Sequence, residues 1–246
     1  MEQFVFTPNC PDNRVSLVAS GDYPEITRAL INEGIRVISV KNPLLNKEVS
    51  SHSDMILCHA EKNTVFIDPS QDKDIFTREG FRVFTSSAPG RLYPEDVKLN
   101  VAVSRDFFLC NKKTADKALL SFLSESGKKE IDVKQGYTKC SVCFVTENAV
   151  ITEDPSIKAA LENSGLDVLE ISKGDIYLSE SHYGFFGGST GKISKDTLAV
   201  TGELKYHRDA HKISDFCHKH GVRIKELKKG RIIDIGGILP LKEVRL

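Results

Sequence analysis

Apolar and polar positions recur along the chain in an order that predicts two strands, a helix and a further strand. Apolar runs at residues 54–59 and 64–68 flank a polar turn at residues 61–63, which is typical of a β-hairpin. A short stretch with helical spacing follows up to residue 80, where a glycine ends it, and residues 81–84 are again apolar. Together these runs predict one unit of hairpin, helix and strand.

The same order returns three more times toward the C-terminus. The predicted hairpins begin with apolar runs at residues 99–103, 140–145 and 184–188, the helices span residues 113–124, 154–165 and 208–220, and the closing strands span residues 130–133, 167–171 and 222–227. Gly165 and Gly221 end two of these helices, as glycine commonly does. Four units with similar internal spacing indicate a repeat protein.

The two ends of the chain complement each other. Residues 14–19, 22–34 and 35–40 predict a strand, a helix and a strand, so this N-terminal unit lacks its first strand. Residues 232–241 form an apolar strand run with no helix after it. Pairing that C-terminal strand with the N-terminal one would complete a fifth unit. Dividing 246 residues by five gives about 49 per unit, which lies within the range of radially repeated folds.

We therefore expect an α/β fold in which five ββαβ-type repeats form a propeller. The N- and C-terminal strands would close the ring, and residues 1–246 would form a single domain. The alternative is a doubly wound open α/β sheet that carries some hairpins.

Several stretches of the chain carry a resemblance to a known superfamily. They are Gly136-Tyr-Thr-Lys-Cys140, Val150-Ile-Thr-Glu-Asp154, Tyr183-Gly-Phe-Phe-Gly187-Gly188 and Gly202-Glu-Leu-Lys-Tyr-His207-Arg-Asp209. With the five-unit pattern, they resemble the pentein superfamily, which includes arginine deiminase, dimethylarginine dimethylaminohydrolase, amidinotransferases and translation initiation factor six. Within it, the chain is most similar to a bacterial family grouped with guanidino-group modifying enzymes. The resemblance implies a pentein-like α/β propeller.

Composition and charge narrow the range of partners. Lys plus Arg and Asp plus Glu each number 34, so the formal net charge is zero, which argues against a dominant nucleic-acid or membrane-surface role. No stretch approaches the roughly 20 apolar residues of a transmembrane helix, and residues 1–11 lack the features of a signal peptide. Six scattered cysteines favour a reducing compartment. We expect a cytoplasmic protein with a small-molecule ligand and no nucleic-acid or membrane partner.

The resemblance also implies a set of site residues. Catalytic penteins have a cysteine nucleophile near their last strand, a His-x-Asp motif at the start of a repeat, and further carboxylates that hold a guanidinium. His52-Ser53-Asp54 matches the His-x-Asp motif, whereas the closing run at residues 235–240 has no cysteine. The Gly236-Gly237 pair in that run can still let the backbone approach a ligand.

Ligand sites in such a ring lie at the axial end, where the repeats present the starts of their first strands. The residues expected there are His52, Asp54, Asn100, Lys139, Cys140, Ser141, His182, Tyr183, Gly187, Gly188 and Ser189. His52 and Asp54 are two apart and would share one face of a strand, so that the carboxylate orients the imidazole or binds a cation. The alternative is a solvated turn whose aspartate caps the backbone.

Cys140 is the candidate to replace the missing nucleophile. A thiolate attacks a guanidinium carbon, and a histidine, here His52, moves protons for the thiol and for the leaving amine. This role requires a lowered thiol pKa, which Lys139 or a nearby histidine would supply. The alternative is a structural thiol at the end of a strand.

Two pairs of residues have the spacing of metal ligands. Cys140 and Cys143 form a CxxC motif but lack a second ligand pair. His207 and His211 are four apart at the start of a predicted helix, without a third ligand. We therefore expect no metal and no cofactor, and His207 and Asp209 remain candidates for substrate binding on the resemblance alone.

Two functions are compatible with these residues. The first is a hydrolase or transferase that acts on a guanidino or related C–N bond, with His52 as acid and base, Asp54 as the orienting or cation-binding group and Cys140 as nucleophile. The substrate-binding candidates are Asn100, His182, Tyr183, Gly187, Gly188, His207, Asp209, Gly236 and Gly237. The second is a non-catalytic protein that binds a small ligand or a macromolecule, as the missing C-terminal cysteine suggests.

Overall fold

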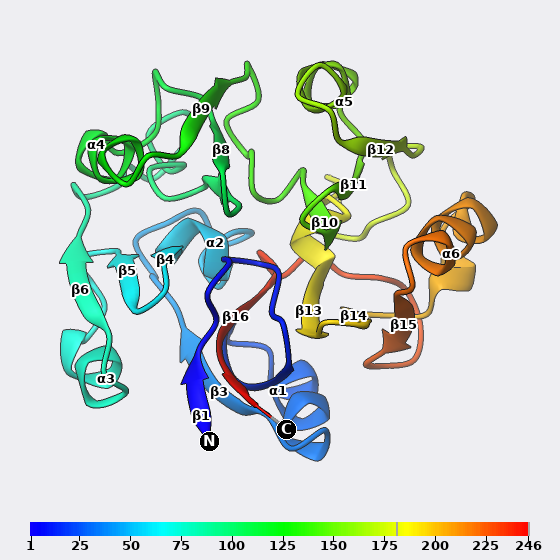
Figure 1. Ribbon diagram of the computed structural model, residues 1–246, viewed down its shortest axis with the longest axis horizontal. Helices are drawn as coiled ribbons and strands as arrows, with labels where there is room; N and C mark the ends of the chain where they lie inside the picture. Colours follow the sequence, from blue (N-terminus) through cyan, green and yellow to red (C-terminus); the bar gives the residue numbers. More distant parts are fainter. Residues whose placement is uncertain (181, 246) are drawn as a thin grey trace.

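The computed structural model describes residues 1–180 and 182–245. Across these residues five small sheets stand around one axis, and Figure 1 looks down that axis onto the ring. In each sheet two strands pair antiparallel, and a third strand runs parallel to the second. The connecting helices lie on the outside of the ring. The predicted propeller of five ββαβ-type repeats is confirmed.

Four repeats follow one another along the chain, each as strand, strand, helix and strand. The first two comprise β4 (Leu57–Glu61), β5 (Thr64–Ile67), α3 (Lys73–Arg78) and β6 (Arg82–Thr85), then β7 (Ala102–Val103), β8 (Phe107–Cys110), α4 (Lys117–Glu125) and β9 (Lys129–Asp132). The next two comprise β10 (Cys143–Thr146), β11 (Ala149–Thr152), α5 (Pro155–Glu162) and β12 (Asp167–Glu170), then β13 (Thr190–Ser194), β14 (Thr197–Val200), α6 (Ala210–Lys219) and β15 (Arg223–Glu226).

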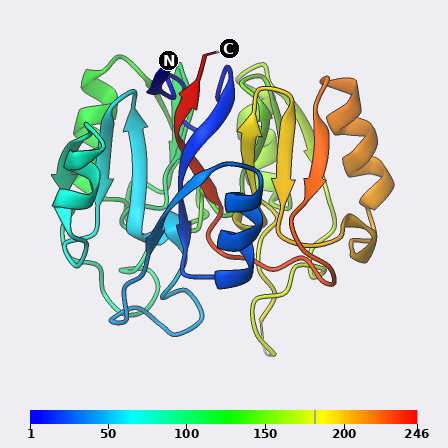
Figure 2. The ribbon, with the colours of Figure 1, turned by 90° about the horizontal axis from the view of Figure 1, so that it is seen from below.

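The remaining repeat joins the two ends of the chain. Its strands and helix are β16 (Ile238–Val244), β2 (Arg14–Gly21), α1 (Pro24–Asn32) and β3 (Arg36–Val40), with β1 (Glu2–Phe4) added at the free edge of β16. Because β16 pairs antiparallel with β2, the C-terminal strand supplies the first strand that the N-terminal unit lacks. The predicted closure of the ring is confirmed. Figure 2 shows both termini at one end of the ring and long connections between repeats at the other.

Local sequence signals start and end the outer helices. The side chains of Asp72, Asp116 and Asp154 accept hydrogen bonds from backbone N–H groups in the first turns of α3, α4 and α5. Gly165 and Gly221 follow α5 and α6 with φ angles of +87° and +67°, a conformation that glycine adopts without steric cost. Among the described residues, no helix is long and apolar enough to cross a membrane.

The strands that begin each repeat are shorter than the sequence pattern predicts. The apolar runs start at residues 54, 99, 140, 184 and 232, whereas the strands start at Leu57, Ala102, Cys143, Thr190 and Ile238. Most of the residues just before these strands are buried, and they form turns, including the helical turns α2 (Ser53–Ile56) and η1 (Gly187–Ser189). Because a buried turn is as apolar as a buried strand, the hydrophobic pattern alone does not separate the two.

These turns are joined to one another by hydrogen bonds around the axis. The backbone N–H of Asp54 donates to the carbonyl of residue 236 (3.1 Å), and that of residue 237 donates to the carbonyl of Gly188 (2.7 Å). The N–H of Gly188 donates to the carbonyl of Cys140 (2.8 Å), and the N–H of Cys140 donates to Oδ1 of Asn100 (3.3 Å). A longer contact of 3.5 Å from Nδ2 of Asn100 to the carbonyl of Asp54 completes the belt. All five repeats thus contribute to one polar belt in the middle of the ring.

Candidate active site

A cavity of about 540 Å³ opens beside the polar belt in the middle of the ring. Its lining includes His52, Cys140 and Asp234, which come from three different repeats. Each of them lies in one of the turns that precede a first strand. The cavity therefore lies at the axial end that the repeat pattern predicts for a ligand site.

His52, Cys140 and Asp234 form a compact group at this cavity. One ring nitrogen of His52, Sγ of Cys140 and one carboxylate oxygen of Asp234 all lie within 4.8 Å of one another. Nδ1 of His52 is 3.6 Å from Oδ1 of Asp234, and neither ring nitrogen has a hydrogen-bond partner. Burial lowers the pKa of His52, opposed by the charge of Asp234. A neutral imidazole with two free nitrogens is suited to move a proton.

The thiol of Cys140 donates a hydrogen bond to Oδ2 of Asp54, with Sγ and Oδ2 2.9 Å apart. Burial and the charges of Asp54 and Asp234 raise the pKa of the thiol well above its usual value. Burial also raises the pKa of Asp54 to about 7. The expected lowering of the thiol pKa is therefore wrong for the empty site, where two carboxylates surround the sulfur.

Lys139 is not among the main influences on the pKa of the Cys140 thiol. Its charge lowers the pKa of Asp54 instead. The side chain is buried, and the backbone N–H of Lys139 donates to Oδ1 of Asn100 at 2.7 Å.

His52 and Asp54 reach the site by a route that differs from the predicted one. They were expected to share one face of a strand, but His52 caps α2 and Asp54 lies inside it. The hydroxyl of Ser53 donates to the carbonyls of Gly236 and Gly237 at 2.8 and 2.7 Å, which pins this segment against the closing repeat as a turn. The turn directs the side chain of His52 toward Asp234 and that of Asp54 toward Cys140.

Asn100 supports Cys140 directly. Its Oδ1 accepts the backbone N–H groups of Lys139 and Cys140, and its Nδ2 lies 3.3 Å from Sγ of Cys140. The residue is buried and is not among the described residues that line the cavity. We assign Asn100 a positioning role.

The predicted glycines pack against site residues. A Cβ at Gly187 would lie 2.5 Å from the carbonyl oxygen of Cys140, and one at Gly188 would overlap Oδ1 of Asp234. A Cβ at Gly236 would lie 2.5 Å from Cβ of His52. Gly237, with a φ angle of +83°, donates its N–H to Gly188. Only glycine leaves room for these side chains at such short range.

His182 and Tyr183 lie at the exposed edge of the cavity. Both line it, and Tyr183 is 50% exposed. Nδ1 of His182 is 3.2 Å from Oε1 of Glu48, on a different connection between repeats. The structure therefore places both predicted residues in the lining of the cavity, and the imidazole grouped with Cys140 is that of His52.

His207 and Asp209 are not brought to the cavity. His207 follows η2 (Leu204–Tyr206) and is buried, with its Nδ1 accepting the backbone N–H of Asp209 at 3.0 Å. The carboxylate of Asp209 accepts from the N–H of Ser172 and pairs with Lys212. Because α6 begins at Ala210, His207 lies outside the helix and does not share a helix face with the exposed His211.

Two buried carboxylates of this region were missed by the sequence analysis. Asp234 is a charged residue within the apolar run at residues 232–235, and that interruption was the available signal. Glu153 follows β11 and is 2% exposed, with Oε2 accepting the N–H of Phe186 at 3.3 Å. Burial raises the pKa of Glu153 to about 8. Nothing in its local sequence marks Glu153 as buried.

The group of His52, Cys140 and Asp234 is also the set of described residues that could hold a metal ion. Imidazole, thiolate and carboxylate are usual ligands of zinc, and the three donor atoms are buried and within 4.8 Å of one another. Bringing them to bonding distance of one ion requires a small contraction and loss of the thiol proton.

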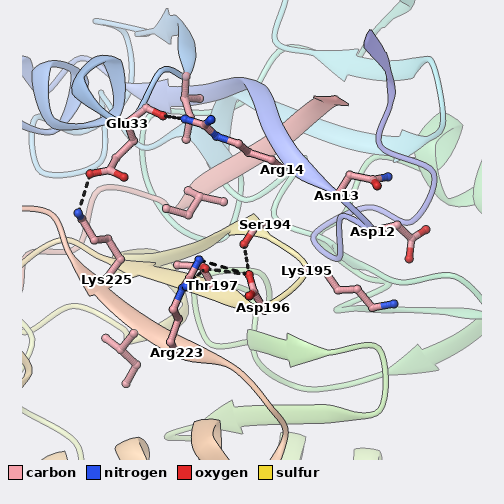
Figure 3. Close-up of a pocket in the computed structure, with 13 residues that line it drawn as sticks. Asp12, Asn13, Arg14, Glu33, Ser194, Lys195, Asp196, Thr197, Arg223 and Lys225 are labelled. Carbon is pink, nitrogen blue, oxygen red and sulfur yellow. Dashed lines mark hydrogen bonds and ion pairs between the residues drawn. The ribbon is translucent and has the colours of Figure 1, made fainter. Parts of the chain in front are cut away.

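A second cavity, of about 650 Å³, lies between the repeat that joins the two termini and the repeat of β13, β14 and β15. It is at the ends of the strands that face away from the first cavity. Figure 3 shows that several of its charged side chains are paired within the protein: Lys225 with Glu33 at 2.6 Å and Arg223 with Asp196 at 3.7 Å. Arg14 donates to the carbonyl of Glu33. Its described lining has neither a cysteine nor a histidine, so it lacks the nucleophile and base of the axial cavity.

Solved structures with a similar fold are enzymes of guanidino chemistry by name. Inosamine-phosphate amidinotransferase from Streptomyces griseus is 12% identical, with a TM-score of 0.58 over 99% of this chain and 98% of that chain. Agmatine deiminase from C. jejuni is 13% identical, with a TM-score of 0.54 over 92% of this chain and 90% of that chain. DDAH from Pseudomonas aeruginosa, complexed with citrulline, is 11% identical, with a TM-score of 0.51 over 87% of this chain and 92% of that chain.

These similarities confirm the pentein-like fold that the resemblance implied. No curated protein matches the chain. Residues 17–239 match the model of a family of unknown function, DUF6873, which covers most of the chain. The chain therefore belongs to the DUF6873 family and has the pentein fold.

Proposed function

We propose that this protein is a thiol-dependent hydrolase or transferase that acts on a guanidinium or a related C–N bond. The observation that carries the proposal is the group of His52, Cys140 and Asp234, whose reactive atoms lie within 4.8 Å of one another at a cavity. A nucleophile, a proton carrier and a carboxylate are the groups that this chemistry requires. The amidinotransferase and the deiminase of the same fold support this reaction class.

The charges around Cys140 suit a cationic substrate. Asp54 is buried and, with Asp234, raises the pKa of the thiol. A planar guanidinium presents parallel N–H donors that match a carboxylate, so it would bind between these groups. Its positive charge would offset both carboxylates and lower the thiol pKa, because a nearby cation favours the thiolate. The substrate would then activate its own nucleophile.

The reaction can be written with the residues in these positions. Sγ of Cys140 attacks the guanidinium carbon and forms a C–S bond, while the thiol proton passes to Asp54 or His52. The C–N bond to the leaving nitrogen breaks, and that nitrogen takes the same proton, delivered by His52 directly or after relay from Asp54, and departs as an amine or as ammonia. Water or an amine then attacks the same carbon, the C–S bond breaks, and the thiol is restored. Water makes the protein a hydrolase, and an amine makes it a transferase.

A second candidate function is non-catalytic binding of the same cationic group. Two observations favour it: the thiol of Cys140 is held by Asp54 in its protonated form, and residues 235–240 contain no cysteine. In this case Asp54 and Asp234 would bind the cation, and Cys140 would serve only as a hydrogen-bond donor.

The location and extent of the functional unit are part of the proposal. All six cysteines are free thiols, which supports a cytoplasmic location. The axial belt draws on all five repeats, which supports one functional domain over the described chain.

The deciding experiment compares Cys140→Ser with Cys143→Ser, a buried cysteine of the same motif that does not line the cavity. Each protein is incubated with a panel of guanidino compounds, with and without EDTA, and release of ammonia, amine or urea is measured. The enzyme proposal expects turnover by the wild type and by Cys143→Ser, and none by Cys140→Ser. Binding of guanidino compounds without any product, equal in the wild type and Cys140→Ser, would establish the non-catalytic function instead.

A further inference from the structure

The axial cavity has a second group of lining residues besides His52, Cys140 and Asp234. Tyr93, Tyr137 and Phe185 form a row of aromatic rings, with centroids 5.5 Å apart for Tyr93 and Tyr137 and 6.1 Å for Tyr137 and Phe185. A cavity of about 540 Å³ is much larger than one guanidinium group needs. The cavity therefore has room for a ligand that extends beyond its guanidinium, with the three aromatic rings along one side.

Asp96 lies at this aromatic wall and has an unused acceptor. The residue is 1% exposed, its Oδ2 accepts from the hydroxyl of Tyr137 at 3.1 Å, and its Oδ1 has no hydrogen-bond partner among the described residues. A buried carboxylate oxygen without a hydrogen-bond partner destabilises the folded protein. A donor on a bound ligand would remove that cost, because Asp96 is one of the residues that line the cavity.

The charges of the lining favour a second cation on the ligand. Glu48, Asp96 and Asp234 are carboxylates, and no described residue of the lining is a lysine or an arginine. A ligand carboxylate would enter the cavity without a positive partner and beside like charges. A ligand ammonium would meet the free oxygen of Asp96 and the faces of the aromatic rings, which attract cations.

We propose, on the basis of the proposed function, that the substrate is an alkylguanidine whose far end carries an amine and no carboxylate. The guanidinium would bind at Cys140, between Asp54 and Asp234. The alkyl chain would lie along the aromatic wall, and the terminal ammonium would donate to Oδ1 of Asp96. In the reaction the ammonium makes and breaks no bond. Asp96 therefore sets specificity and is not a catalytic residue.

The test uses three probes that differ only at the far end of the chain: agmatine, which ends in an ammonium, N-acetylagmatine, which is neutral there, and arginine, which adds a carboxylate. Values of kcat/KM are measured for the wild type, for Asp96→Asn and for Asp215→Asn, an exposed aspartate of α6 that serves as the matched control. The protection of Cys140 against alkylation by each probe is measured in parallel.

We expect kcat/KM for agmatine to exceed that for N-acetylagmatine at least tenfold and that for arginine by more, with Asp215→Asn unchanged. Asp96→Asn should lower the value for agmatine about tenfold and leave N-acetylagmatine nearly unaffected. Turnover of arginine or N-acetylagmatine as fast as agmatine by the wild type would overturn the substrate class while sustaining the reaction. Protection of Cys140 that depends on the ammonium and on Asp96, without turnover, would sustain the ligand class and overturn the reaction.

Discussion

The thiol of Cys140 donates a hydrogen bond to Oδ2 of Asp54 at 2.9 Å, although 86 residues separate the two along the chain. Burial raises the pKa of Asp54 to about 7 and that of Cys140 well above its usual value. One proton is thus shared between a thiol and a carboxylate from different repeats. This arrangement keeps the thiol of Cys140 protonated, and we expect a bound cation to change that state.

Asp54→Asn should make the thiol of Cys140 more acidic. Asp54 raises the thiol pKa through its charge and its hydrogen bond, and both effects disappear in the variant. We expect the thiol pKa to fall, which makes alkylation of Cys140 roughly tenfold faster near pH 8. Alkylation rates against pH, with the modified cysteine identified by mass spectrometry, measure this. Asp215→Asn is the control, and an unchanged rate in Asp54→Asn would show that Asp54 does not hold the proton.

Asn100→Ala should loosen the turn that carries Cys140. Two buried backbone N–H groups, those of Lys139 and Cys140, lose their acceptor. We expect a loss of about 2 kcal/mol in the free energy of unfolding and a fall in kcat larger than any rise in KM. Urea denaturation and steady-state kinetics measure the two effects. Asn163→Ala, at the exposed end of α5, should change the free energy of unfolding by less than about 0.5 kcal/mol, and an equal effect in both variants would contradict the role of Asn100.

Gly188→Ala should displace the carboxylate of Asp234. The new methyl group would overlap Oδ1 of Asp234, so one of the two must move. Since small displacements of reacting groups are costly, we expect activity to fall about 100-fold, with a loss of about 1–3 kcal/mol in stability. Gly127→Ala provides the comparison, because its Cβ meets open space and its φ of +82° costs only about 1 kcal/mol. Full activity in Gly188→Ala would show that the position of Asp234 is not critical.

Glu153→Gln should stabilise the protein at alkaline pH. Burial raises the pKa of Glu153 from 4.5 to about 8. Between these values the unfolded chain releases the proton while the folded protein retains it, so the contribution of Glu153 to stability falls as the pH rises. The variant lacks this penalty and should exceed the wild type by about 2 kcal/mol at pH 8.

The difference between Glu153→Gln and the wild type should shrink as the pH approaches 5. Urea denaturation at several pH values measures it, and Glu162→Gln, at an exposed position of α5, should show no such trend. A constant difference at all pH values would mean that Glu153 does not titrate in this range.

Much of the ring could be predicted from the chain alone. The helix caps at Asp116 and Asp154 and the glycines that follow the helices act through contacts within a few residues, so they are visible in sequence. The pairing of β16 with β2 is not local, yet the incomplete units at the two ends implied it. Repetition made that long-range contact predictable, because the four complete repeats show which strand the incomplete N-terminal unit lacks.

The site was less predictable than the ring. His52, Asp54 and Cys140 were named in advance and lie together, but Asp234 was not named, and His207 and Asp209 lie away from the cavity. The turns that carry the site were assigned to strands because their residues are buried. A buried turn and a buried strand have the same apolar pattern. The turns that hold the reactive groups were therefore the segments assigned wrongly to strands.

Local chemistry along the chain was therefore enough to establish the number of repeats, the order of their elements and the closure of the ring. The protonation of Cys140, the approach of Asp234 and the free acceptor of Asp96 arise only when segments from different repeats meet. The physical reason is that helix caps and hydrophobic periodicity act over a few residues. A pKa, by contrast, depends on every charge and on all the solvent excluded around one atom in the folded ring.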